Sequence, residues 1–243
     1  MKYFELISTL YLKEDIHYTK LHYKLSKFIN EAFNDKDELS KLHFSRDFKY
    51  YSFDLIYNPN VKIVNKTYPK DNTYTFRLRS PDEELITTLQ TRFRKVNNPT
   101  FSYLFSKLRE VKKFFVKEIK TLTPVIVTLR EDKDRYINWT YEYNGDIKTL
   151  HTQLHQNILK KYNSFYNEKL EPFCNFIQAI EFKNKKPQTI RIEKDNKEIK
   201  FFGNKFILIP NEDKISQKLA FFTLSVGLGE KNSFGAGFCA ARR

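Results

Sequence analysis

The sequence predicts an α+β protein made of two tandem units, each in the order β-α-β-β-α-β, and three observations support this. Apolar residues alternate in short β-rich runs, as at Phe4, Leu6 and Leu10. Other segments carry apolar residues at helical spacing. A chain of 243 residues has room for two domains of roughly 120 residues. We therefore expect two ferredoxin-like (RRM-like, βαββαβ) domains, at 1–119 and 120–243.

In the first half, the run from Phe4 to Leu10 is the first expected strand. A helix over 18–33 follows, because Leu21, Leu25 and Phe28 fall on one face. Further strands are expected at 48–56, 61–64, 73–78, 101–108 and 111–119. Between them, Ser80 can cap a second helix and Pro81 suits its first position. Its core face holds Leu85, Leu89 and Phe93.

The second half repeats this outline more loosely. Helices are expected over 147–162 and from Pro210 to Leu224. Strands are expected at 122–129, 176–182, 189–192, 199–209 and 238–241.

The charge of the chain favours a polyanionic partner. The formal net charge is +14, and both halves carry more Lys and Arg than Asp and Glu. A body this basic attracts nucleic acid. An anionic membrane surface and a merely Lys-rich soluble surface are the alternatives.

Several classes of protein are not indicated. No run of about 18 apolar residues is present, so we expect no membrane span. The N-terminus lacks the pattern of a signal peptide, which makes the cytoplasm the expected compartment. Cys174 and Cys239 are isolated, so neither a disulfide framework nor a zinc site is indicated.

A glycine cluster near the C-terminus is the most specific local feature. Four of the six glycines fall within 227–237, at Gly227, Gly229, Gly235 and Gly237. Glycine suits positive φ or close backbone approach, and such a loop can present N–H groups to phosphates. Lys231, Asn232 and Ser233 add a charge and polar donors. The pattern fits neither a nucleotide-triphosphatase loop nor a dinucleotide fold. A tight connection between a helix and the last strand is the alternative.

The order Gly-hydrophobic-Gly, a polar insert and Gly-x-Gly-hydrophobic, within 226–238, resembles the signature of the repeat-associated RNA-binding (RAMP) superfamily of CRISPR systems. The whole chain resembles the endoribonuclease family that cuts precursor CRISPR RNA inside each repeat. This resemblance implies paired ferredoxin-like domains and cleavage without metal or cofactor. It implies 2′,3′-cyclic phosphate and 5′-hydroxyl products.

Metal-free RNA cleavage uses a base, an acid and a cation that stabilises the phosphorane. His43 precedes Lys49 by six residues in a basic, aromatic segment that resembles the catalytic segment of this family. The resemblance implies that His43 is the general acid or base and that Lys49 stabilises charge. Arg46 can assist or bind phosphate. For His43, a plain surface position is the alternative.

The position of a third catalytic partner differs from that in some family members. Some family members have a tyrosine where this chain has Asn30, and because Asn cannot act as a base, either the triad is reduced or Tyr23 substitutes. His22 is the second histidine candidate. His151 and His155 stand at i, i+4, but no third ligand accompanies them, so we interpret them as surface residues.

Three arginines are the main expected RNA contacts outside the glycine cluster. Arg77 and Arg79 alternate on one strand, and Arg130 flanks a loop in the second half. Each can follow phosphates while nearby aromatic side chains stack on bases. A solvated surface charge is the alternative for each.

The sequence thus predicts an endoribonuclease acting on CRISPR repeat RNA, as monomer or homodimer. Other CRISPR effector subunits are possible partners. A non-cleaving RNA-binding subunit of a CRISPR effector complex is the first rival. A general basic RNA-binding protein is the second.

Overall fold

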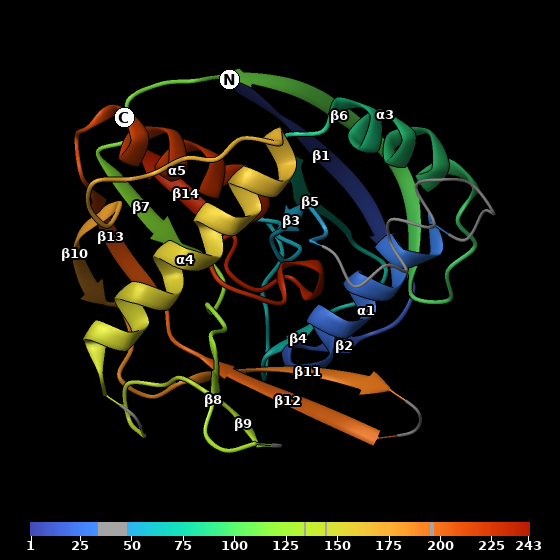
Figure 1. The fold of residues 1–243 in the computed structure, drawn as a ribbon. Coiled ribbons are helices and arrows are strands. Elements are labelled where there is room, and N and C mark those ends of the chain that lie inside the picture. Colours follow the sequence, from blue (N-terminus) through green and yellow to red (C-terminus); the bar gives the residue numbers. More distant parts are fainter. Residues whose placement is uncertain (34–47, 134, 144, 195–196) are drawn as a thin grey trace.

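The computed structural model describes residues 1–33, 48–133, 135–143, 145–194 and 197–243, and two four-stranded antiparallel sheets form its frame (Figure 1). The elements of the first half are β1 (Lys2–Leu12), β2 (Ile16–His17), α1 (Tyr18–Glu31), β3 (Ser52–Phe53), β4 (Thr67–Tyr68), β5 (Thr73–Ser80), α3 (Glu83–Arg92), the short helix η1 (Phe93–Lys95) and β6 (Phe101–Lys112). The first sheet has the strand order β3-β5-β1-β6.

The second half repeats this order and adds two hairpins. Its elements are β7 (Glu118–Thr121), β8 (Thr128–Arg130), β9 (Tyr136–Asn138), α4 (Ile147–Tyr166), β10 (Ile177–Phe182), β11 (Gln188–Lys194), β12 (Lys197–Gly203), β13 (Phe206–Pro210), α5 (Lys214–Val226), the short helix η2 (Asn232–Phe234) and β14 (Cys239–Arg242). The sheet order β10-β13-β7-β14 places the strands as in the first sheet, while β8–β9 and β11–β12 pair separately. The two predicted ferredoxin-like folds are therefore confirmed. The expected domain boundary after residue 119 falls within β7 and stays a prediction.

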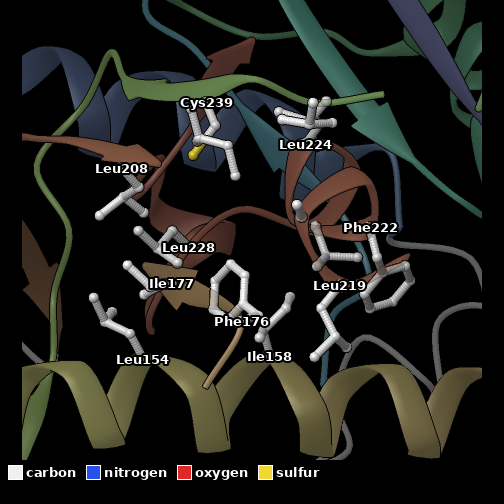
Figure 2. Close-up of a cluster of buried hydrophobic side chains, with 14 of the residues drawn as sticks. Leu154, Ile158, Phe176, Ile177, Leu208, Leu219, Phe222, Leu224, Leu228 and Cys239 are labelled. Atoms are coloured by element: carbon white, nitrogen blue, oxygen red, sulfur yellow. The ribbon is translucent and has the colours of Figure 1, made fainter. Parts of the chain in front are cut away.

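Each sheet buries an apolar face under its own helices. In the first half, Leu6 and Leu10 of β1 pack with Leu25 and Phe28 of α1. In the second half, Figure 2 shows the apolar face of α4 turned towards side chains of the sheet and of α5. Alternation in strands and helical spacing in helices are what the sequence predicted for these faces.

Helix α5 is covered on all sides. Every residue from Leu219 to Val226 is buried, which is typical of a helix enclosed between layers. On one side the Phe222 ring lies 5.3 Å from that of Tyr162 in α4. On another, the Phe221 ring lies 5.2 Å from that of Tyr3 in β1. Within the described part of the chain, no helix combines the length and apolar character needed to cross a membrane.

Five expected strands differ from the structure. Of 48–56, only Ser52–Phe53 is a strand. Residues 61–64 form only an isolated bridge at Val64, and 113–117 connect the two sheets instead of continuing a strand. Residues 122–127 form a packed turn, with isolated bridges at Val125 and Ile126. Residues 123–127 are buried by loop packing, whereas Ile63 and Val64 are 40% and 56% exposed, and apolar content alone distinguishes neither case from a strand.

The expected strand 199–209 is divided at Gly203. The segment at Val125 forms an isolated bridge with Asn204 and approaches Gly203 so closely that a side chain there would collide with the Val125 carbonyl. Consequently β12 enters a hairpin and β13 enters the second sheet.

The second helix of the first half begins two residues later than expected. Asp82, rather than Ser80, is the N-cap, and its carboxylate accepts from the Leu85 N–H at 3.0 Å. The Ser80 hydroxyl accepts from the Asp82 N–H and donates to the Tyr50 carbonyl. Asp82 is the N-cap because Ser80 is the last residue of β5.

Arg79 joins the two halves through a buried network. Its Nε lies 2.5 Å from the Glu5 carboxylate, and both side chains are at most 6% exposed. Its Nη1 donates to the carbonyls of Leu224 at 3.3 Å and Cys239 at 2.6 Å. The guanidinium also lies over the Phe238 ring. One cation thus ties the first sheet to the end of α5 and to β14.

Replacing Arg79 with methionine is expected to lower the free energy of unfolding by about 3 kcal/mol, because a buried carboxylate and two carbonyls lose their partner. Urea denaturation measures this change. Arg109→Met is the matched control. Arg109 pairs with the same Glu5 from a side chain that is 55% exposed, so its loss should cost less than about 1 kcal/mol. Equal effects of the two variants would contradict this account.

Candidate nucleic-acid interface

The segment 227–237, called the glycine loop, crosses the middle of the molecule between α4 and α1 (Figure 1). It borders a cleft of about 530 Å³, called the central cleft. The lining comes from the glycine loop, the outer face of α4 and the segment before β3, and comprises Phe48, Lys49, Tyr50, Val127, Gln153, Gln156, Asn157, Lys160, Lys161, Val226, Gly229, Glu230, Lys231, Asn232, Ser233 and Phe234. This surface therefore joins residues from both halves of the chain.

The four glycines allow the loop to be packed closely. All have positive φ, between 64° and 80°. A side chain at Gly235 would meet His22 and Phe53, and one at Gly237 would collide with the carbonyl of Leu228. Glycine is required here both for backbone conformation and for space.

The loop backbone is bonded mainly inside the protein. The N–H groups of Gly227, Gly235 and Gly237 donate to the carbonyls of Thr223, Asn232 and Pro124, each at 2.9 Å. The expectation that these three N–H groups donate to phosphates does not fit this geometry. The half-buried side chains of Lys231 and Ser233 remain on the cleft surface, as expected for RNA contacts.

Asn232 braces the loop from within. Its Nδ2 donates to the carbonyls of Leu228 and Ala236, and the side chain is buried. Its Oδ1 accepts from the Lys161 ammonium of α4 at 2.7 Å. The structure thus gives Asn232 an internal role in place of the expected RNA contact.

Lys161 is a site residue that the sequence analysis missed. Its Nζ also donates to the carbonyls of Gly229 at 2.6 Å and Gly227 at 3.4 Å. Burial lowers the pKa of Lys161 to about 7, opposed by the charge of Glu230. The sequence pattern that could have identified it is its position three residues after Ile158, on the apolar face of the helix that also holds Leu154. A lysine on an apolar stripe indicates a buried charge.

Of the four expected catalytic residues, one lines the central cleft, one lies outside it and two are not among the described residues. Lys49 lines the central cleft together with Lys231 and Ser233. His43 and Arg46 lie outside the described residues. Tyr23 packs half-buried against a cluster that contains Ile126 and does not line the cleft.

His22 has a structural position. The side chain is buried, and its Nδ1 lies 3.0 Å from the carbonyl of Phe234 in the glycine loop. Burial lowers the pKa of His22 to about 4, so its neutral imidazole donates this bond near neutral pH. The side-chain oxygen of Asn30 is also buried, without a hydrogen-bond partner among the described residues.

The three arginines predicted to bind RNA have different surroundings. Arg79 is 5% exposed and fully engaged, as described above, so it presents no surface to RNA. Arg77 is half-buried and paired with Asp54 at 2.6 Å. Arg130 is exposed and borders a second hollow of about 640 Å³ with Tyr136. Gln153 and Glu230 line both hollows, so the second one continues the central cleft.

The histidine pair of α4 also acts inside the protein. The Nδ1 of His155 accepts from the Phe176 N–H at 3.1 Å, and His151 Nε2 lies 2.7 Å from the Ile177 carbonyl. His155 is buried, which corrects its interpretation as a surface residue. No group of three potential metal-binding side chains occurs in the ranges that the structure describes.

Comparisons with known proteins agree with this geometry. A family model described as CRISPR associated protein Cas6, C-terminal, matches residues 108–241. CRISPR-associated endoribonuclease Cas6 2 of Methanocaldococcus jannaschii is 30% identical over 240 residues, covering 93% of this chain and 94% of the relative. A solved structure named CRISPR associated protein Cas6 has a TM-score of 0.73 at 23% identity, covering 99% of this chain and 100% of its own. Another, named an RAMP protein binding different RNA substrates, has a TM-score of 0.71 at 18% identity with the same coverage. Both structures share the fold of this chain.

Replacing Gly237 with alanine is expected to destabilise the protein by at least about 3 kcal/mol, because positive φ and a steric collision act together. Gly145→Ala is the control: its φ is also positive, at 55°, but the nearest atom to an added side chain is 3.6 Å away. That variant should lose only about 1 kcal/mol. Urea denaturation compares the two, and similar losses would show that close packing of the loop is not decisive.

Proposed function

The chain belongs to the Cas6 family of CRISPR-associated proteins, and we propose that it cleaves CRISPR repeat RNA without a metal ion, leaving 2′,3′-cyclic phosphate and 5′-hydroxyl ends. The curated relative is named an endoribonuclease. The observation that carries the proposal is the central cleft, because it places Lys49 beside the side chains of Lys231 and Ser233. A candidate charge-stabilising side chain and candidate contacts to the RNA backbone thus share one surface.

In the proposed reaction, the RNA 2′-hydroxyl attacks the adjacent phosphorus and the 5′-oxygen leaves. One group accepts the proton of the 2′-hydroxyl and another donates a proton to the departing oxygen. His43 takes one of these roles, and Lys49 stabilises the charge on the phosphorane oxygens. Arg46 binds a neighbouring phosphate. Tyr23 has no role in this scheme because its ring packs outside the cleft.

The proposed path of the RNA follows the polar lining of the cleft. From Lys49 and Lys231 it passes the exposed Lys160 of α4. It then reaches the second hollow, where Arg130 and the 64% exposed Tyr136 offer a cation and a stacking face. Such a channel suits single-stranded RNA, since unpaired bases are free to stack.

The first test concerns the chemistry. Repeat RNA incubated with the protein in EDTA is expected to be cut, and a 2′-deoxy substitution at the cut site should abolish cleavage, because it removes the nucleophile. Product ends are identified by mass spectrometry. Cleavage of the deoxy substrate would contradict the proposed reaction. Binding without cleavage of the unmodified RNA would favour the non-cleaving RNA-binding subunit.

The second test concerns His43. His43→Ala is expected to slow single-turnover cleavage by about 10²–10⁴-fold, the usual contribution of a general acid or base. RNA affinity, measured by fluorescence anisotropy, should change by less than about threefold. His17→Ala is the matched control, because His17 is exposed and bonds Thr19 outside the cleft. Full activity of the His43 variant would overturn the assignment.

A further inference from the structure

Lys161 is a buried cation without a direct counter-ion among the residues that the structure describes. The side chain is 5% exposed, and its three hydrogen-bond acceptors are neutral oxygens: the carbonyls of Gly227 and Gly229 and the Asn232 amide. Among the described residues, no carboxylate lies within ion-pairing distance of its Nζ. Burying a lysine in this way costs free energy unless an anion compensates it.

The charged group nearest in effect to Lys161, the Glu230 carboxylate, opposes the lowering of its pKa only in part. The Glu230 carboxylate accepts from the N–H and hydroxyl of Thr128, at 3.1 and 2.7 Å, and is held at the edge of the cleft. Burial raises the pKa of the Cys239 thiol to about 12, so that group is uncharged. The remaining charged side chains of the lining, Lys49, Lys160 and Lys231, have the same sign as Lys161. Among the described residues, the lining thus sets one carboxylate, which is bonded to Thr128, against four lysines.

We propose that Lys161 supplies the charge of a phosphodiester-binding subsite in the floor of the central cleft, and that the RNA backbone provides the close counter-ion that Lys161 lacks among the described residues. The inference rests on the proposed function, because it concerns the same RNA. Lys161 does not touch the phosphate. It acts as a positioning residue: its charge acts across the glycine loop in a poorly solvated region, where Coulomb interactions are strong. Lys231 and Ser233 make the direct contacts.

This arrangement couples RNA binding to proton uptake. A phosphate beside Lys161 favours its charged form and raises its pKa above the value of about 7 in the free protein. Near pH 7.5 the free protein is partly deprotonated at Lys161, and the complex is protonated. Affinity is therefore greatest below the free pKa and falls as the pH rises towards the bound pKa. The limit is about tenfold per pH unit for one proton.

The experiment measures affinity for host CRISPR repeat RNA with a 2′-deoxy cut site, from pH 6.5 to 8.5. Wild-type affinity is expected to fall by about tenfold over this range. Isothermal titration in phosphate and Tris at pH 7.5 should show proton uptake. In Lys161→Met, the pH dependence and the proton uptake should be reduced, and affinity at pH 6.5 should fall about tenfold. Lys161→Gln, which keeps a neutral donor for the loop carbonyls, should behave like Lys161→Met.

Salt dependence separates a role of charge from a role in loop structure. Removing one phosphate-neutralising charge should reduce the slope of log affinity against log salt by about 0.7. Asn232→Ala loosens the same loop without changing the charge, so it should weaken binding with an unchanged slope. Lys169→Met removes an exposed charge that lines neither hollow and should have neither effect.

The inference is overturned if the Lys161 variants keep the wild-type pH profile and salt slope, or if they only weaken binding as Asn232→Ala does. Failure of the wild type to cut repeat RNA would instead overturn the proposed function. In that case, the same titrations with oligouridylate would decide the role of Lys161.

Discussion

The arrangement of the molecule depends on the burial of helix α5, which is complete from Leu219 to Val226. An apolar surface that surrounds a helix has to be covered on every side, and one sheet covers only one side. The second sheet and α4 therefore cover part of α5, and β1 of the first half covers another part through Tyr3. Burial of this helix holds the two ferredoxin-like folds against each other.

The position of α5 determines the position of the glycine loop, because the loop begins where the helix ends. Ser225, in the last turn, accepts a hydrogen bond at its carbonyl from the Ser52 hydroxyl of the first half. Ser26 and His22 of α1 then hold the carbonyls of Ser233 and Phe234. Hydrogen bonds from the first half thus hold the helix end that leads into the loop and the loop itself, and the central cleft lies along the side of the loop that these bonds leave uncovered.

The polar groups of this region separate into two layers. Asn232, Lys161 and His22 lie beneath the surface and bond loop oxygens. Lys231 and Ser233 lie above them, on the cleft. A buried, hydrogen-bonded polar layer holds the loop in one conformation. The loop therefore loses less conformational entropy on binding a ligand than a mobile loop would.

The sequence by itself determined the order of the main elements and the place of the glycine loop. Alternation at Phe4 to Leu10 and helical spacing at Leu21 to Phe28 are local patterns that each fit one kind of element. The positive φ of Gly227 to Gly237 was readable because few other residues adopt it. Only the tertiary structure decided that Arg79 and Asn232 are internal braces, that 199–209 divides at Gly203, and that Lys161 lies beneath the cleft. These depend on contacts between distant segments, and the charge or amide of a side chain does not reveal whether its partner is water, RNA or another part of the chain.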